Sequence, residues 1–154
     1  MKTRTIALIL AVCFVAVAVG FASDVNLGTW KLNEAKSKFP AGAVKNNTVA
    51  YEAVGDSVKT TVDGTDGDGK PTHNEWTGKF DGKDYSLIGD AAADTRSYKK
   101  IDDRTIELVN KKDGKVTLSG RIVVSADGKS RTLTMSGTDA KGKKIKYTAV
   151  FDKQ

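Results

Sequence analysis

One short stretch of the chain gathers side chains suited to binding a metal ion. Residues 63–75 read DGTDGDGKPTHNE, a run rich in aspartate and glycine that ends on Glu75. On the calcium-loop pattern D-x-[DN]-x-[DN]-G-x5-E, Asp66 and Asp68 take the third and fifth positions and Gly69 takes the sixth. Carboxylate oxygens at this spacing would suit a Ca2+ ion.

The same stretch departs from a calcium loop in two respects. The first ligand position is a glycine, with Asp63 displaced by one residue. Residues 64–70 (GTDGDGK) also recur as residues 137–143 (GTDAKGK), where Lys141 replaces Asp68 and would repel a cation. The shared frame is typical of a hairpin turn, in which aspartate supplies turn hydrogen bonds and glycine accepts a positive φ. The sequence therefore predicts no dedicated metal site, and weak Ca2+ binding stays an open alternative.

Candidates for catalysis are few. His73 is the only histidine, and Glu75 lies two residues on, where it shares the same strand face and could hydrogen-bond to it. The only cysteine, Cys13, falls in an apolar N-terminal run, and the chain has no Gly-x-Ser-x-Gly motif. A nucleophile would have no visible general base. The sequence favours a protein that is not an enzyme and holds no cofactor.

The N-terminus carries an export signal. Lys2 and Arg4 precede an apolar run over residues 6–19, which is followed by the small-residue pattern Gly-Phe-Ala. Residues 1–22 are therefore predicted to be a signal peptide cleaved after Ala22. The run is shorter than the ~18 to 20 apolar residues of a membrane-spanning helix, so no stable membrane insertion is expected after cleavage. We expect an exported protein, periplasmic or secreted.

The mature chain, residues 23–154, is predicted to form a single domain. Without Lys2 and Arg4, 23 basic residues face 19 acidic ones, so the formal charge falls from +6 to +4. The lysines are spread along the chain beside acidic residues, which does not indicate a nucleic-acid-binding surface. Loss of Cys13 with the signal peptide would leave no thiol, although lipidation of Cys13 stays open. A monomer is expected.

Glycine-containing turns punctuate the mature chain and predict a series of β-hairpins. Asp-Gly between alternating runs is the strongest short-range hairpin signal, because glycine accepts the positive φ that tight loops require. Between the turns, apolar residues recur at every second position; Val116, Leu118, Ile122 and Val124, for example, are predicted to share one strand face. Such alternation is typical of half-buried antiparallel strands.

Ten strands follow from this pattern. They cover residues 27–33, 47–54, 57–64, 72–79, 83–89, 94–101, 104–111, 115–125, 129–138 and 143–152. Short loops predict that each strand pairs with its sequence neighbours in a meander. Because an open meander would expose two long edges, an all-β, up-and-down antiparallel β-barrel of about eight to ten strands is favoured over a two-sheet β-sandwich. Helix is expected only as a turn at residues 34–36.

The first mature strand supports a family resemblance. Residues 28–32 read GTWKL, which is similar to the Gly-x-Trp signature that opens lipocalins and fatty-acid-binding proteins. The mature chain resembles those barrels in length and hairpin order, and most resembles small exported lipocalin-like proteins of bacteria. The resemblance implies that Gly28 and Trp30 are structural, with Trp30 packed at the closed end of the barrel and a ligand entering at the other.

Two features depart from the fatty-acid-binding proteins. Those proteins place an arginine two residues before an aromatic residue in the last strand, where it holds the ligand carboxylate. Here Ala149 stands two residues before Phe151, so this carboxylate anchor is expected to be missing. Their two-helix lid is also not expected, since residues 33–46 are too few for two packed helices.

Aromatic residues on apolar strand faces are the predicted ligand contacts. Tyrosine and tryptophan offer stacking area together with one polar group. The candidate lining residues are Tyr51, Trp76, Tyr85, Tyr98, Met135 and Tyr147. We expect the barrel interior to bind a small apolar or amphipathic molecule. The alternative is a non-enzymatic interaction or inhibitor protein, which would use a solid barrel to present the loops at residues 63–71 and 89–94.

Overall fold

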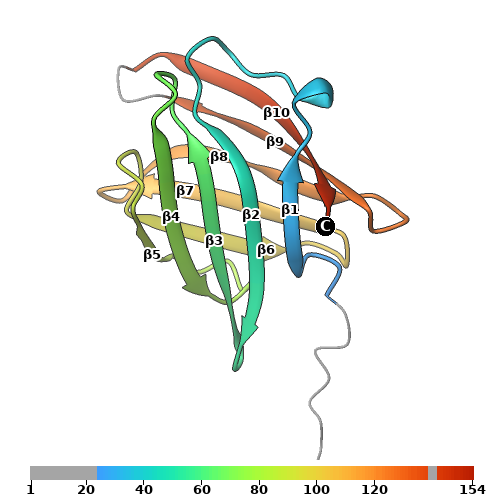
Figure 1. Ribbon diagram of the computed structural model, residues 1–154. Coiled ribbons are helices and arrows are strands. Elements are labelled where there is room, and N and C mark those ends of the chain that lie inside the picture. The colour runs from blue at the N-terminus through green and yellow to red at the C-terminus, as the bar shows by residue number, and fades with distance from the viewer. Residues whose placement is uncertain (1–23, 139–141) are drawn as a thin grey trace, which may run out of the picture.

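The computed structural model describes residues 24–138 and 142–154 as a closed barrel of ten antiparallel strands (Figure 1). The predicted signal peptide lies outside the described residues. Every strand pairs with its sequence neighbours, and β1 closes the barrel by pairing with β10 as well as β2. The strands are β1 (Gly28–Leu32), β2 (Lys45–Val54), β3 (Ser57–Thr65), β4 (Pro71–Gly78), β5 (Tyr85–Ile88), β6 (Thr95–Lys100), β7 (Thr105–Lys112), β8 (Lys115–Val124), β9 (Ser130–Thr138) and β10 (Lys144–Lys153).

The predicted barrel is confirmed, and its closing register rules out the two-sheet sandwich. Trp30 pairs with Lys153 and Leu32 with Phe151, so neither terminal strand leaves a free edge. The helical turn expected at residues 34–36 is the 3-10 helix η1 (Glu34–Lys36). A closed antiparallel meander is the architecture that the resemblance to these barrel families implies.

The Asp-Gly turns adopt the backbone that their sequence predicts. Between β7 and β8, Asp113 has a φ of 49° and Gly114 a φ of 74°. Two successive positive φ angles match the twist of the flanking strands and allow a two-residue hairpin. The turn from β3 to β4 is longer, and there Asp66 Oδ1 accepts hydrogen bonds from the backbone N–H groups of Asp68 (2.9 Å) and Lys70 (2.8 Å). The opening acidic stretch is therefore a hairpin held by its own aspartate.

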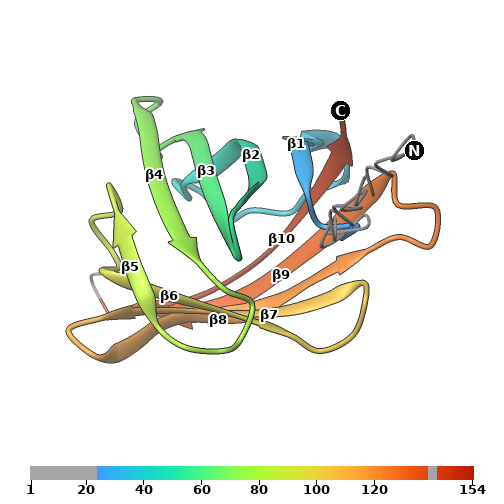
Figure 2. The same cartoon turned by 90° about the horizontal axis from the view of Figure 1, so that it is seen from below.

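One end of the barrel interior is filled by aromatic side chains. Trp76 stacks edge-on against Tyr98, with ring centroids 4.7 Å apart, and Phe80 packs against both. Trp30 is fully buried, and its Nε1 donates a hydrogen bond to the carbonyl oxygen of Asn26 (2.9 Å). Figure 2 shows the strands β1–β4 and β6–β9 on opposite sides of the barrel. The filled end is the one at which the chain enters β1.

The predicted inward face of β8 is wrong at the start of the strand. Val116 was expected to point inward with Leu118, but it is 57% exposed. The pairing of β7 with β8 shifts here, because Asn110 faces Leu118 whereas Lys111 faces Val116. The extra residue in β8 is Thr117, and such a bulge reverses the facing of the residues beyond it. Ile122 and Val124 are buried as predicted.

The ladder around β5 is the shortest in the barrel. β4 meets β5 through two residue pairs, Glu75 with Ile88 and Trp76 with Leu87. β5 in turn meets β6 through Tyr85 with Arg96 and Ser86 with Thr95. Each of β3, β7, β8 and β9 pairs with both of its neighbouring strands over a much longer register. The barrel is therefore least firmly closed at β5.

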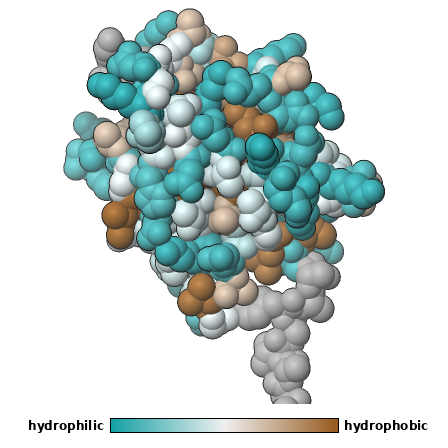
Figure 3. Space-filling view, in the orientation of Figure 1, coloured by the Kyte–Doolittle hydropathy of each residue, from teal (hydrophilic) through white to brown (hydrophobic). Residues whose placement is uncertain are grey.

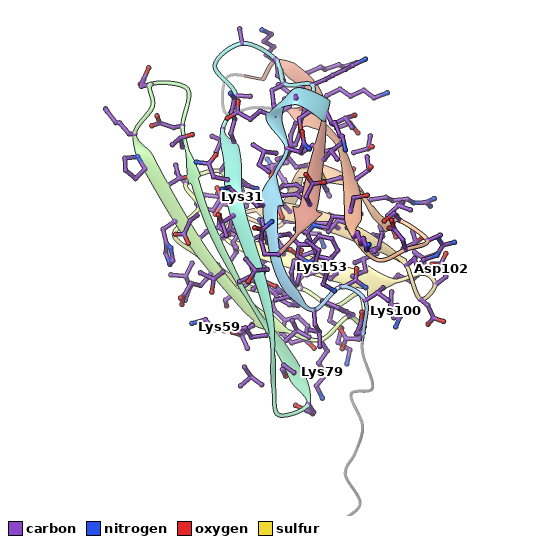
Figure 4. All side chains as sticks on the ribbon, turned by 45° about the vertical axis from the view of Figure 1, so that its right-hand side comes forward. Lys31, Lys59, Lys79, Lys100, Asp102 and Lys153 are labelled. Carbon is purple, nitrogen blue, oxygen red and sulfur yellow. The ribbon has the colours of Figure 1, made fainter. Side chains whose placement is uncertain are left out.

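The outer surface carries scattered charges. Figure 3 shows a face covered mainly by hydrophilic residues with apolar ones dispersed between them. Lysines such as Lys59 and Lys100 lie on the outside of the barrel (Figure 4), where they pair with Glu75 (2.9 Å) and Asp24 (3.3 Å). Among the described residues, no helix is long and apolar enough to cross a membrane.

Candidate functional site

The barrel encloses a cavity of about 480 Å3 that opens at the end opposite Trp30. Its mouth lies between the β3–β4 turn, the loop that precedes β2 and the loop from β5 to β6. Strand alternation places every second side chain inside, so the walls come from several strands at once. The apolar lining residues within the strands include Val49, Val62, Leu108, Leu118, Ile122, Leu133, Met135, Ala149 and Phe151.

Four of the six residues predicted to contact a ligand line this cavity. Tyr51, Tyr98 and Met135 are buried in its walls, and Tyr147 stacks on Phe39 near the mouth with ring centroids 5.6 Å apart. The other two lie behind the lining, in the aromatic cluster of the filled end.

Trp76 and Tyr85 act as packing residues in this structure. Trp76 is 1% exposed, and its Nε1 donates a hydrogen bond to the carbonyl oxygen of Arg96 (2.8 Å). Tyr85 packs edge-on against Trp76 at 5.7 Å, while its hydroxyl donates a hydrogen bond to Asp81 (2.9 Å) on the surface. Trp76 packs against the lining residue Tyr98, and Tyr85 packs against Trp76.

Sequence reasoning missed two arginines inside the barrel. Arg96 is 6% exposed and Arg131 is 3% exposed, and both line the cavity. The alternation pattern contained the signal: Arg96 has the same parity as Tyr98 on β6, and Arg131 has the same parity as Met135 on β9. The cavity thus has basic groups from β6 and β9, although Ala149 stands where the fatty-acid-binding proteins place their last-strand arginine.

Arg131 lies among three aromatic rings at the filled end. Its guanidinium carbon is 4.8 Å from the ring centroids of Trp30 and Tyr51 and 4.9 Å from that of Phe151. Such cation–π contacts offset part of the cost of removing the charge from water. The Nε and Nη1 atoms of Arg131 nevertheless have no hydrogen-bond partner among the described residues. Both nitrogens are also enclosed by the protein, so a ligand reaches them only if the neighbouring rings move apart.

Arg96 belongs to a polar network with two tyrosines. Its Nε donates a hydrogen bond to Asn110 Oδ1 (2.7 Å), and its Nη1 lies 3.5 Å from the Tyr98 hydroxyl. The hydroxyls of Tyr98 and Tyr51 are 3.4 Å apart. Burial is the main cause that raises the pKa of Tyr98 far above its ordinary value, so this phenol stays neutral. We refer to Tyr51, Arg96, Tyr98 and Arg131 together as the cavity floor.

No carboxylate balances the two arginines of the cavity floor. Every aspartate and glutamate among residues 24–138 and 142–154 is at least partly exposed. Only Asp66 and Asp90 reach the cavity lining, and both belong to loops at the mouth. Within this part of the chain neither arginine forms an ion pair. The interior therefore carries two uncompensated positive charges.

Three of the side chains considered for metal binding or catalysis, those of Asp63, His73 and Glu75, lie on the exposed surface of β3 and β4. His73 Nδ1 is 2.7 Å from Asp63 Oδ1, and His73 Nε2 is 3.7 Å from Glu75 Oε1. All three side chains are well exposed to solvent. Within the described residues, no three His, Cys, Asp or Glu side chains are grouped so that they could hold a metal ion. His73 and Glu75 form a surface charge cluster with Lys59.

Comparisons with known proteins found similar folds among solved structures. No family model and no curated protein matches the chain. It is similar to EF1p2_mFAP2b, solved bound to DFHBI, with a TM-score of 0.47 and 13% identity over 84% of this chain and 94% of that chain. It is also similar to mFAP1, a redesigned β-barrel solved bound to DFHBI, with a TM-score of 0.45 and 16% identity over 84% and 95% of the two chains.

Proposed function

We propose that the protein is a non-enzymatic carrier that binds one small amphipathic anion inside the barrel. The acid group lies at the cavity floor, against Arg131 and Arg96, and the apolar part extends along the walls toward the mouth. One observation carries this proposal: two buried arginines face a cavity that contains no carboxylate at the same depth.

The energetics favour an anionic ligand over a neutral one. A buried, unpaired ion costs several kcal/mol even after relaxation. A buried donor without an acceptor costs roughly 1 to 3 kcal/mol. An acid group at the floor would remove both penalties, since arginine binds oxyanions through paired, charge-assisted hydrogen bonds. Residues such as Leu108 and Leu133 would then contribute about 25 cal/mol for each Å2 of apolar ligand surface that they cover.

The cavity also favours a carrier over the alternative of a solid barrel that presents its loops. Its volume of about 480 Å3 lies within the range of roughly 300 to 1,000 Å3 that is usual for small-molecule sites. The polar groups at its floor are suited to holding charge, and they offer no nucleophile with an adjacent base. Export belongs to this proposal and rests on the sequence of residues 1–22. A monomeric state also belongs to it, and a closed barrel that leaves no strand edge free for pairing supports this state.

Native mass spectrometry of the purified protein tests this function. We expect a ligand mass that is lost on denaturation, or that appears after incubation with decanoate. The variant Arg131→Met should lose this mass, whereas Arg121→Met, which removes an exposed arginine of β8, should retain it. Wild-type protein that stays bare after exposure to decanoate, decyl phosphate and decyl sulfate would overturn the proposal.

A further inference from the structure

The two positive charges of the cavity floor indicate how many negative charges the head group of a ligand carries. Both arginines flank the same pair of tyrosines. The guanidinium carbon of Arg131 is 4.8 Å from the Tyr51 ring centroid, and that of Arg96 is 5.8 Å from the Tyr98 ring centroid. The two tyrosine rings are 6.1 Å apart. One ligand head group placed at this pair of rings would therefore feel both positive charges.

Nothing at the floor supplies the opposite charge. Tyr98 stays a neutral phenol, and the closest acidic groups on the cavity lining, Asp66 and Asp90, belong to the mouth. A singly charged head group would neutralise one guanidinium and leave the other buried without a counter-charge. A doubly charged head group would neutralise both.

The free donors agree with a head group that has several oxygens. Arg131 Nε and Nη1 together carry three N–H bonds without a partner, and because both nitrogens are enclosed by the protein, a head group that binds them must displace the neighbouring rings. Arg96 Nη1 has only a long contact of 3.5 Å with the Tyr98 hydroxyl. A phosphate group presents three strong acceptor oxygens and bears a charge of about −1.5 to −2 at neutral pH, whereas a carboxylate presents two oxygens and one charge.

We propose that the ligand is a phosphate monoester on an apolar tail, bound as a dianion across Arg96 and Arg131. This inference rests on the proposed function, and it specifies the ligand class of the same cavity. The phosphate oxygens accept hydrogen bonds from both guanidinium groups, and the tail contacts the apolar walls.

Isothermal titration calorimetry with three ligands of equal tail length tests the inference. Decyl phosphate, decyl sulfate and decanoate differ only in the head group, and decyl sulfate shares the three-oxygen shape of the phosphate with a single charge. At about pH 8, decyl phosphate should bind at least about ten-fold more tightly than either of the others. At about pH 5, where the phosphate holds one charge, this advantage over decyl sulfate should vanish.

The sulfate also controls for protonation of the protein. Asp66, Asp90 and His73 lie at or near the mouth, and Tyr51, Tyr98, Arg96 and Arg131 face the ligand head. A change in any of these groups between the two pH values would affect decyl sulfate as well. Only the ratio of the two affinities reports the second charge of the phosphate.

Variants of Arg96 test whether this residue causes the preference for phosphate over sulfate. Arg96→Met should reduce the preference for phosphate over sulfate to about one. Arg96→Lys should keep most of it, because the charge remains. Arg121→Met serves as the surface control, and circular dichroism verifies that each variant is folded. Should Arg96→Met unfold, the pH dependence of the wild-type ratio still decides the matter.

The outcomes separate the inference from the proposed function. If decyl sulfate or decanoate binds as tightly as decyl phosphate at about pH 8, the inference of a dianionic ligand is wrong, while the proposed carrier function still stands. Inorganic phosphate that binds as tightly as decyl phosphate would overturn the requirement for an apolar tail. Failure of all three amphiphiles to bind would overturn the carrier itself.

Discussion

Arg131 shows how the barrel combines an unfavourable charge with favourable contacts. Its guanidinium lies against the rings of Trp30, Tyr51 and Phe151, and each such contact is worth ~0.5 to 2 kcal/mol. The unpaired Nε and Nη1 donors and the buried charge oppose this stabilisation. In the empty protein we expect the penalty to be larger than the gain, because no counter-charge lies at the same depth.

Replacing Arg131 should therefore stabilise the empty barrel while it impairs binding. Arg131→Met keeps an unbranched apolar side chain against the three rings and removes the charge. We expect the free energy of unfolding in urea to rise by roughly 1 to 3 kcal/mol, since replacing buried ionic groups by apolar ones of similar volume is often stabilising. A lower free energy of unfolding would mean that the ring contacts outweigh the desolvation of the guanidinium.

His73 provides a second test, on the outer surface. The hydrogen bond to the Asp63 carboxylate is the main cause that raises the pKa of His73 in the folded protein. The ion pair therefore contributes its full stabilisation below the unfolded pKa of about 6.5, and the contribution fades as the pH rises through the higher folded pKa. Asp63→Asn should lower the His73 pKa toward its ordinary value in an NMR titration of the imidazole protons. Asp68→Asn, at the nearby turn, should leave it unchanged.

The residues of the site were only partly predictable from the sequence. Alternation correctly assigned Tyr51, Tyr98, Met135 and Tyr147 to the interior, but it contains no information about depth along the barrel axis. Trp76 shares the inward face and yet packs beyond the cavity, in the filled end. Arg96 and Arg131 were overlooked because arginine is mostly exposed in proteins, although their parity placed them inside.

At the scale of elements, the strands followed from turn chemistry and period-two alternation. The prediction placed a strand at every position where the barrel has one, because Asp-Gly turns and inward apolar residues agree from one strand to the next. The bulge at Thr117 was not predictable, since a bulge changes the pairing with β7 and leaves little trace in the sequence of β8 itself. Val116 was misplaced for that reason.

The short ladder of β5 should be visible in hydrogen exchange. With two residue pairs on each side, β5 has the fewest cross-strand bonds to hold its amides. We expect the amides of Ser86 and Leu87 to exchange faster than those in the centre of β9, such as Leu133 and Met135. Amide exchange by mass spectrometry or NMR would measure this, and equal protection of β5 and β9 would contradict it.

At the scale of the whole molecule, ligand binding should raise thermal stability. A ligand that binds only the folded barrel stabilises it by about 2.7 kcal/mol at a concentration one hundred times its Kd. For a domain of this size, that corresponds to a rise in Tm of roughly 10 °C. Decyl phosphate should produce this rise in a thermal scan, whereas 1-decanol, which has the same tail without the charge, should produce little. A comparable rise with 1-decanol would show that the tail alone accounts for binding.

The two ends of the described chain lie together, away from the mouth. The Lys153 Nζ donates a hydrogen bond to the Val25 carbonyl oxygen (3.0 Å), and the Gln154 N–H donates one to the Thr29 carbonyl oxygen (2.9 Å). In Figure 1 this point lies opposite the β3–β4 turn that borders the cavity. An affinity tag, a fluorescent protein or a solid support joined after Gln154 would thus be held behind the barrel. The molecule could be immobilised in one orientation, with its cavity facing the solution, and used as a sensor.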